Sequence, residues 1–598
     1  MLETIDWVII AAYFALSLGI GLWYSKRAGK SSSEFFLGGR NMPWYLAGIS
    51  MVATTFAADT PLAVNELVVQ NGISGNWIWW SALTGGMLTT FFFARMWRRA
   101  EVLTELEFIE LRYGGKQAGF LRGFKAVYLG LIMNTLIIGW VNVALMTILH
   151  VMFPALSYNE ILIYTAAAMV ITALYSSISG LWGVAVTDAV QFLIAMSGCI
   201  ILAVIVVNSE KIGGIDGLKA QLADKPWAFN FFPSVSNNAQ GAAGTAYSIT
   251  WLTFIAFVGV QWWSSWYPGA EPGGGGYVAQ RMMSAKNEKH AIFATLFFQI
   301  AHYALRPWPW ILVGLCCLVL YPGLAVPREG YVMAMNEFLP AGLKGMLLVA
   351  FLAAYMSTIS TQLNWGASYL VNDLYKRFTR PVSSFKSEEV AEKHYVMAAR
   401  VVTIVVMAIA MVVSPFIHSI SGVWEFIMEC GAGLGLVLIL RWYWWRINAW
   451  SEIAATIAPF IAYAVCKFGI EGVLVKGAEL VYWQNNKITF FITVIFTTVT
   501  WLVTTFATKP ESDATLSHFY KKVRPMGNWG KFTLPANVGK PGYLVLCWLS
   551  SIVMIYSTLF FIGKLIFKEY SEAGIYAAVV VVAFFILRYC SMKTKVLE

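Results

Sequence analysis

Residues 268–276 read Pro-Gly-Ala-Glu-Pro-Gly-Gly-Gly-Gly and follow directly on the apolar run 247–267. Such a segment cannot stay helical, and inside a bilayer its freed backbone groups must line a cavity, because unsatisfied amides cost several kcal/mol there. Residues 53–61, Ala-Thr-Thr-Phe-Ala-Ala-Asp-Thr-Pro, interrupt the run 44–70 in the same way. Two broken helices in corresponding positions point to a transporter site at the membrane midplane. The alternative for the glycine-rich segment is a cytoplasmic loop, since residues 247–267 alone are long enough to cross.

The composition places the whole chain in a membrane. Of its 598 residues, 58% are apolar and 12% are charged, against roughly 25% charged in soluble domains. About fifteen apolar runs have the roughly 20 residues that cross a bilayer. They lie near 5–24, 44–70, 76–96, 121–152, 161–180, 181–207, 247–267, 290–321, 345–375, 395–417, 422–446, 451–470, 487–508, 542–566 and 572–592. No hydrophilic stretch between them is long enough for a soluble catalytic domain, so we expect one all-α transmembrane domain over 1–598 that is not an enzyme.

The basic residues predict an orientation. Glu3 precedes the first run and Lys26 and Arg27 follow it, so the run lacks the basic front of a signal peptide and is expected to be an uncleaved helix. With the N-terminus outside and the C-terminus inside, the cytoplasmic loops hold roughly 29 Lys and Arg and the outer loops roughly 9. The net charge of +10 is thus explained by basic residues in the cytoplasmic loops, and it does not require a nucleic-acid partner. Seven cysteines are expected to be small buried hydrophobes: Cys199, Cys316, Cys317, Cys430, Cys466, Cys547 and Cys590.

The two interruptions open two blocks with the same number of spans. Residues 44–207 and residues 247–446 each contain five predicted spans. Because five is odd, the second block is inverted relative to the first, which is typical of many secondary transporters. Residues 5–24 precede these blocks as an extra helix, and residues 451–598 follow as further helices.

The ninth run is rich in small hydroxyl residues. Ser357, Ser360, Thr361 and Asn364 lie at i, i+3, i+4 and i+7, so they share one helix face. In membrane helices such residues serve as packing devices that bond to their own backbone. With carbonyls from an unwound helix they also supply the oxygens that a hard cation such as Na⁺ requires.

Asp188 is an acid near the predicted cytoplasmic end of the sixth run. A bare carboxylate in hydrocarbon costs roughly 2.5–3.5 kcal/mol, so it is expected to face the bundle interior or water. It is either a cation ligand, the reading we favour, or an acid at the interface.

A cavity between the two breaks is expected to have acidic and aromatic walls. The candidate solute-binding residues are Thr55, Asp59, Thr60, Trp79, Trp80, Trp263, Glu271, His302 and Glu425, with Glu429 one turn further on. Such walls suit a neutral sugar or polyol first and an organic cation second. An organic acid comes third, because Arg306 and His302 alone offer it a basic partner. These residues also have alternative, structural roles. The tryptophans could anchor the protein at the membrane interface, His302 could serve in packing, and the two glutamates could pair with a neighbouring helix.

Several motifs resemble those of the sodium/solute symporter family, which includes sodium/proline, sodium/galactose and sodium/glucose cotransporters. They are Ser-Glu-Phe-Phe-Leu-Gly-Gly-Arg at 33–40, Gln280-Arg281 with Ala-Lys-Asn at 285–287, and Ser357-Thr358. The resemblance covers roughly residues 30–446. It implies a five-plus-five inverted repeat of leucine-transporter type with extra flanking helices.

The resemblance also implies sodium sites. One is formed by the backbone carbonyls of Ala53, Phe56 and Ala354 with the hydroxyls of Ser357 and Thr358, where Thr358 departs from the frequent Ser-Ser pair but keeps the oxygen. A second sodium, present in some members, maps onto Asp188, Ser357, Ser360 and Thr361. The segment 261–267, Gln-Trp-Trp-Ser-Ser-Trp-Tyr, departs from the sugar carriers, which leaves the solute open.

We therefore expect a sodium-coupled symporter that imports a small organic solute by alternating access. Na⁺ is the coupling ion, without an organic cofactor. The expected partners are the solute and membrane lipid, and the chain is a monomer or weak homo-oligomer in the cell membrane, the inner membrane in a bacterium. The competing classes are a membrane-embedded enzyme, for which we find no nucleotide, metal or histidine-carboxylate motif, and a channel or transporter-like sensor.

Overall fold

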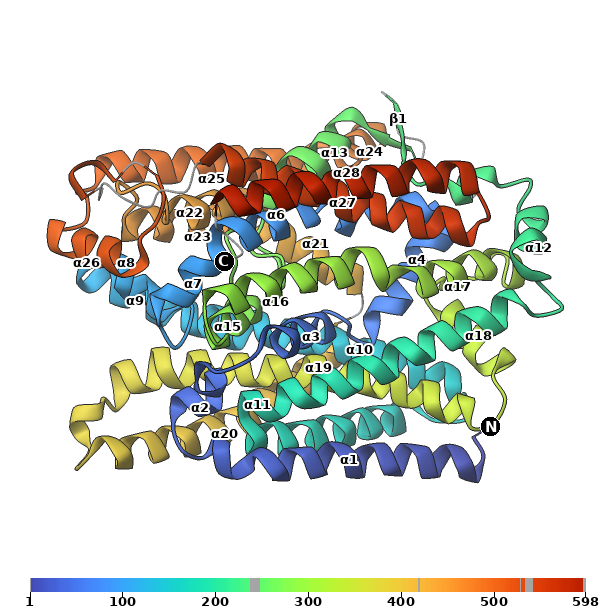
Figure 1. Ribbon diagram of the computed structural model, residues 1–598, viewed down its shortest axis with the longest axis horizontal. Coiled ribbons are helices and arrows are strands. Elements are labelled where there is room, and N and C mark those ends of the chain that lie inside the picture. The colour runs from blue at the N-terminus through green and yellow to red at the C-terminus, as the bar shows by residue number, and fades with distance from the viewer. Residues whose placement is uncertain (1, 237–247, 418–419, 528, 533–540, 595–598) are drawn as a thin grey trace.

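The computed structural model describes residues 2–236, 248–417, 420–527, 529–532 and 541–594. Its long helices lie side by side in one bundle (Figure 1). The spans are α1 (Thr4–Ala28), the bent pair α3 (Trp44–Thr54) and α4 (Asp59–Asn71), α9 and α10 (Gly115–Met152), α11 (Tyr158–Val207), α16 and α17 (Glu288–Leu320), α19 (Leu343–Ser368, extended to Thr379), α20 (Glu388–Val413), α23 (Ala449–Ala464, extended to Leu474), α25 (Ile488–Ala507), α27 (Pro541–Ile566) and α28 (Tyr570–Thr594).

Shorter elements connect or interrupt these spans. They are α2 (Ser32–Leu37), α5 (Trp77–Trp80), α6 (Leu83–Leu88), α7 (Ala94–Ala100), α8 (Glu107–Arg112), α12 (Gly214–Gln221), α13 (Trp251–Ile255), α14 (Trp262–Ser264), α15 (Gly276–Ser284), α18 (Glu329–Phe338), α21 (Ile420–Cys430), α22 (Leu434–Leu440), α24 (Ala478–Asn485) and α26 (Asp513–Val523). Two three-residue strands, β1 (Ser234–Ser236) and β2 (Ser248–Thr250), pair in parallel. The seven cysteines are all buried, as expected.

In the described residues, ten helices are long and apolar enough to cross a membrane, or eleven if the bent pair is one span. The fifteen expected runs exceed that number for a simple reason. Helical segments that are too short or too polar to cross replace the expected runs 76–96, 247–267 and 422–446, and α11 takes in two runs. The number of crossings and the side of each terminus stay predictions.

Burial separates central from peripheral helices. In α19, 94% of the most apolar 18-residue window is buried, against 22% in α28, so α19 is a central helix with polar residues on it. Helices α3, α10 and α11 pack against α19. In Figure 1, α25, α27 and α28 lie along one edge of the bundle and α1 and α20 along the other. The central group therefore carries the bent pair.

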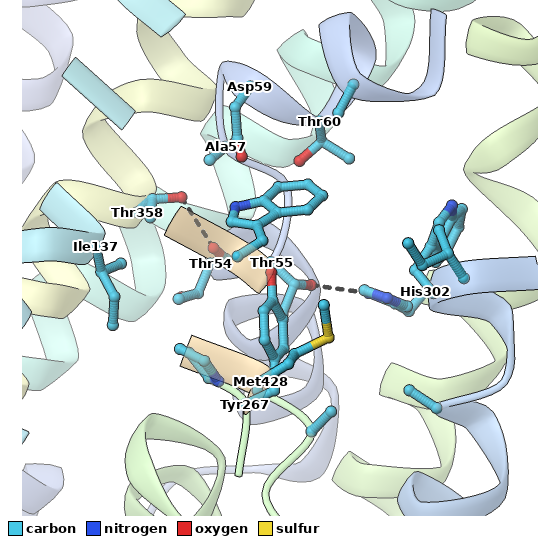
Figure 2. A pocket seen from close by; sticks show the side chains of 18 of the residues that line it. Thr54, Thr55, Ala57, Asp59, Thr60, Ile137, Tyr267, His302, Thr358 and Met428 are labelled. Carbon is cyan, nitrogen blue, oxygen red and sulfur yellow. Dashed lines mark hydrogen bonds between the residues drawn. The ribbon is translucent and has the colours of Figure 1, made fainter. Parts of the chain in front are cut away.

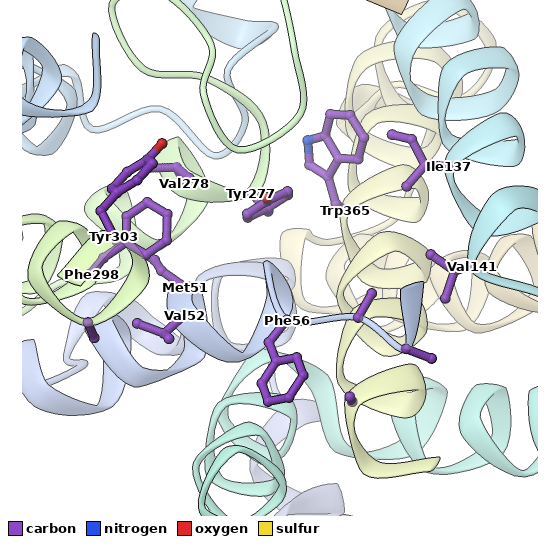
Figure 3. Close-up of a cluster of buried hydrophobic side chains, with 14 of the residues drawn as sticks. Met51, Val52, Phe56, Ile137, Val141, Tyr277, Val278, Phe298, Tyr303 and Trp365 are labelled. Atoms are coloured by element: carbon purple, nitrogen blue, oxygen red, sulfur yellow. The ribbon is translucent and has the colours of Figure 1, made fainter. Parts of the chain in front are cut away.

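Apolar side chains close the core around that bent pair. Figure 3 shows Met51, Val52 and Phe56 beside aromatic residues such as Tyr277 and Trp365. These side chains come from α3, its loop, α15 and α19, which are far apart in sequence, and all of them are buried. A close-packed interior of this kind transmits strain, so a movement of α3 is felt by α15 and α19.

Gly180 divides α11 where the expected runs 161–180 and 181–207 meet. Its φ of 58° and ψ of −169° interrupt the helical dihedrals and lie in a region that only glycine adopts readily. A Cβ there would lie 3.0 Å from both Ala28 Cβ and the carbonyl oxygen of Phe35. The turn therefore needs glycine for its backbone and for the close approach of its neighbours.

We predict that Gly180→Ala lowers the free energy of unfolding by about 1–3 kcal/mol, because the strained dihedrals persist with a side chain present. The measurement is thermal or denaturant unfolding of the purified protein in detergent. Gly19→Ala is the matched control, since Gly19 lies in α1 with nothing within 4 Å of its Cβ position. Equal stability of the two variants would show that the turn tolerates a side chain.

Candidate cation and solute site

Both predicted helix breaks are present. Helix α3 ends at Thr54 and α4 begins at Asp59, and the two are bent by 58°. Helix α14 ends at Ser264 and α15 begins at Gly276. Trp266 and Glu271 between them are at most 4% exposed, so this segment is packed inside the protein and is not a solvent-exposed loop.

Backbone N–H and C=O groups at the second break form hydrogen bonds with side chains and with the turn between α21 and α22. Trp97 donates its indole N–H to the carbonyl of Gly273 at 2.9 Å, and Glu105 accepts from the amide of Gly276 at 2.6 Å. The amide of Gly433, between α21 and α22, donates to the carbonyl of Ser264 at 2.9 Å. Irregular backbone at membrane depth is tolerated only under such conditions.

The end of α3 meets the hydroxyl face of α19. Thr358 donates its hydroxyl to the carbonyl of Thr54 at 2.8 Å, and the hydroxyls of Thr54 and Thr361 lie 3.0 Å apart. Ala53, Phe56 and Ala354, expected to supply carbonyl ligands, are all at most 3% exposed. The structure thus brings the hydroxyls of α19 to the unwound end of α3.

A second polar cluster surrounds Asp188, which is fully buried. Its carboxylate accepts hydrogen bonds from Ser50 at 2.5 Å and Ser357 at 2.7 Å. The Arg281 guanidinium lies 3.7 Å from the same carboxylate and donates to Thr361 at 2.7 Å. Three of the four expected ligands of a second sodium, Asp188, Ser357 and Thr361, are therefore linked here, with an arginine among them. The Ser360 hydroxyl instead bonds to the carbonyl of Ser357 on its own helix.

Sequence reasoning named Arg281 as part of a motif and missed it as a site residue. It lies on α15 and is fully buried. One signal was available: a buried carboxylate such as Asp188 requires a counter-charge, because breaking such a pair is strongly destabilising.

A cavity of about 180 Å³ lies between the two breaks (Figure 2). Of the expected solute-binding residues, Thr55, Asp59, Thr60, Trp79 and His302 line it. Residues that we did not expect there include Trp140, Tyr267, Arg306, Gln362 and Trp424. Its charged lining residues among those described are Asp59 and Arg306, so the walls are aromatic but do not have the acidic balance that we expected.

The remaining expected residues do not line the cavity. Trp80 is fully buried and packs on Phe560. Trp263 donates to the carbonyl of Gly259 on its own helix. Glu271 turns back and accepts from the amide of Gly269 at 3.1 Å, and the side chain of Glu425 lies outside the described residues.

His302 and Arg306 reach the end of α3 from the segment between α16 and α17. His302 Nδ1 lies 3.0 Å from the Thr55 hydroxyl, and its Nε2 lies 3.3 Å from Arg306 Nη2. A guanidinium only donates, so Nε2 is the acceptor and Nδ1 carries the proton toward Thr55. Figure 2 shows His302 and Thr55 facing one another across the cavity edge. This local turn is a π-bulge, a distortion frequent at functional sites.

Comparisons with known proteins agree with this geometry. Residues 35–458 match the model of the family described as "Sodium:solute symporter family". The chain is 25% identical over 497 residues to a sodium/glucose cotransporter of Vibrio parahaemolyticus, covering 77% of this chain and 85% of that protein. It is 24% identical to a sodium/mannose cotransporter of Bos taurus, covering 75% and 76%.

The structure is similar to that of a Na⁺-coupled sialic acid symporter, solved in a substrate-bound outward-open state. The TM-score is 0.65 with 19% identity, and the match covers 85% of this chain and 99% of that one. At this identity the likeness shows the fold alone, and it supports the expected leucine-transporter type. The bounds of the two repeats, 44–207 and 247–446, stay predictions.

We predict that Arg281→Met lowers the free energy of unfolding by about 3–5 kcal/mol, because it leaves the buried Asp188 carboxylate without its counter-charge. Adding Asp188→Asn should recover part of that loss, since the two effects are coupled. Unfolding of the purified variants in detergent measures both. Arg99→Met is the control: Arg99 pairs with Glu288 at a partly exposed site and should cost less than about 1 kcal/mol. A loss after Arg281→Met as small as that of the control would contradict the pairing.

Proposed function

Because the chain belongs to the sodium:solute symporter family, we propose that it is a sodium-coupled symporter that imports a small organic solute by alternating access. The observation that carries this proposal is the meeting of the unwound end of α3 with the hydroxyl face of α19. Hydroxyl and carbonyl oxygens are the ligands that a hard cation takes. The chain is a multi-pass membrane protein, with at least ten apolar spans in its described part.

We propose that the coupling sodium is held by the carbonyls of Ala53, Phe56 and Ala354 with the hydroxyls of Ser357 and Thr358. In support, Thr358 already lies against the carbonyl of Thr54, next to Ala53. A hydroxyl that donates to a carbonyl exposes its own lone pairs, so a cation can gather both oxygens without a large movement. Ser357 lies one residue away and links this site to Asp188.

We also consider a second sodium site. Its ligands would be Asp188, Ser357, Ser360 and Thr361. The carboxylate there is fully buried and Arg281 provides one positive charge beside it. Binding a further cation at this place requires the guanidinium to move away from Asp188 and Thr361. We therefore propose one sodium per cycle as the minimal stoichiometry.

The cation site and the cavity share a wall, which supports coupling. Thr54 and Thr358 line the cavity, and their contact joins α3 to α19. An ion that fixes this contact also fixes the wall against which the solute binds, so binding of one favours binding of the other. Each net charge that moves down the membrane potential contributes about 2.3 kcal/mol per 100 mV, enough for tens-fold accumulation, since 1.4 kcal/mol is tenfold.

A sugar or polyol skeleton is the solute that we propose first. Curated relatives are named for glucose and mannose, and the cavity walls carry Trp79, Trp140 and Trp424. Indole faces pack on the C–H faces of sugar rings. Organic cations and organic or amino acids are the alternatives, and the charged residues of the cavity decide among them.

The direct test is uptake by purified protein in proteoliposomes with an inward sodium gradient. A panel of radiolabelled sugars, polyols, amines and acids is tested with Na⁺ and with K⁺ in its place. Saturable uptake that requires both Na⁺ and solute is the expected result. Ion current without solute saturation would instead indicate a channel.

We predict that Thr358→Val raises the sodium concentration for half-maximal uptake about tenfold or more, because it removes a ligand oxygen at constant shape. Thr358→Ser, which keeps the oxygen, should stay near wild type. Ser368→Ala is the matched control, since the Ser368 hydroxyl bonds to its own helix at the carbonyl of Trp365. The measurement is initial uptake rate against sodium concentration. Unchanged sodium activation in Thr358→Val would remove this residue from the cation site.

A further inference from the structure

Arg306 is a buried cation in the wall of the solute cavity. The side chain lines the cavity and is 2% exposed. Within the described ranges, no carboxylate oxygen lies within 4.0 Å of its guanidinium. An ionisable residue inside a membrane is costly and marks a substrate or ion pathway, with a partner to be identified. The cavity itself contains space for that partner.

From this arrangement we infer that the transported solute carries a carboxylate group, which binds to Arg306. The inference rests on the proposed function and deepens it by naming the chemical class of the solute. It revises our expectation from sequence, in which a neutral solute came first because the walls were expected to be acidic.

The hydrogen bonds of Arg306 leave one buried donor of the guanidinium, Nε, without an acceptor. Nη1 donates to the carbonyl of Val52 and to the hydroxyl of Thr55, both at 3.1 Å. Nη2 contacts the neutral His302 at 3.3 Å, and Nε has no hydrogen-bond partner. Arginine binds carboxylates through two parallel N–H groups. The edge formed by Nε and Nη2 is such a fork, and it contains a donor without an acceptor.

A purely structural role for Arg306, in which it only stabilises the end of α3, would explain the hydrogen bonds of Nη1 alone. Val52 lies in the last turn of α3, and a cation at a helix C-terminus is favourable by roughly 0.3–1 kcal/mol. That contact uses one end of the guanidinium. It explains neither why Nε lacks a partner nor why the residue lies against an open cavity.

Asp59 attracts Arg306 electrostatically, but the two form no salt bridge within 4.0 Å among the described residues, so Asp59 remains available to the other end of the solute. It is the first residue of α4, where the helix dipole favours an acid. The cavity thus has a cation at the end of α3 and a carboxylate at the start of α4, with aromatic walls between them. This is complementary to a small acid that carries a hydroxyl or ammonium group at its other end. Sugar acids and amino acids share this chemistry.

A neutral analogue should bind less well for a physical reason. It enters the cavity but leaves the charged donors of Arg306 without an acceptor, and a site built around a polar partner rejects a ligand that lacks it. Hydrogen bonds to charged groups contribute about 1.5–3 kcal/mol. We therefore predict a preference for the acid of about tenfold or more.

Matched pairs of probes test this inference. Glucuronate is compared with glucose, gluconate with sorbitol, and proline with prolinamide, by calorimetric titration of the purified protein in Na⁺ and in K⁺. The expected result is that the acid of at least one pair binds in Na⁺ about tenfold or more tightly than its neutral partner. The first two pairs and the third pair distinguish a sugar acid from an amino acid.

Variants of the arginine make the test specific. Arg306→Gln should weaken binding of the acid about tenfold or more and change binding of the neutral partner less than about threefold, and Arg306→Lys should lie between wild type and Arg306→Gln. Arg400→Gln is the matched control, because Arg400 lies in α20, bonds to the carbonyl of Ser177 and does not line the cavity. Thermal stabilisation by Na⁺ alone reports whether each variant folds. If Arg306→Gln is unstable, Arg306→Lys decides the question.

Three outcomes would overturn the inference: the neutral partners bind as tightly as the acids, only neutral solutes bind, or the Arg306 variants weaken acid and neutral partner equally, as a purely structural role requires. Sodium-dependent binding of a neutral sugar would leave the proposed symport intact. Absence of sodium-dependent binding for every probe would count against the proposed function itself.

Discussion

The hydrogen-bonding demand of a helix that stops inside the membrane is the constraint on which the rest of this structure depends. Between Thr54 and Asp59 the chain leaves the helix, and no lipid can satisfy the carbonyls and amides that this frees. Side chains from other helices must do so. Thr358 bonds to the carbonyl of Thr54 and Arg306 to that of Val52. The side chains that form hydrogen bonds to the broken helix therefore also lie around the cavity.

Charge pairing holds the remaining helices in register around this centre. The pair of Asp188 and Arg281 joins α11 to α15. Toward the end of the bundle that carries α8 and α26, Arg122 contacts Asp373 at 2.7 Å, and Arg441 contacts Glu452 at 3.1 Å. Arg122 and Asp373 lie 251 residues apart in sequence, whereas Arg441 and Glu452 are only 11 apart. Removing one partner of such a buried pair is costly, so the pairs help to specify which helices adjoin.

The features that follow from local sequence were predictable, and those that depend on the rotation of a helix were not. Glycine and proline mark the break at 268–276, and threonines, an acid and a proline mark the break at 53–61, so both could be identified from the sequence. Trp79 and Trp80 are adjacent, yet one lines the cavity and the other packs on Phe560. That choice depends on how α5 is turned, which composition does not determine. Arg281 was missed as a site residue for a related reason, because the burial of α15 follows from its packing.

The broken helix also explains why an ion and a solute are used together. Thr54 and Thr55 are adjacent at the end of α3: one contacts Thr358 on α19 and the other contacts His302 and Arg306. A regular helix would direct neighbouring side chains about 100° apart along one rigid axis. At this helix end the two residues hold the cation wall and the solute wall on opposite sides of one short segment. A shift of that segment would move both walls together, and this is the physical basis of the coupling that we propose.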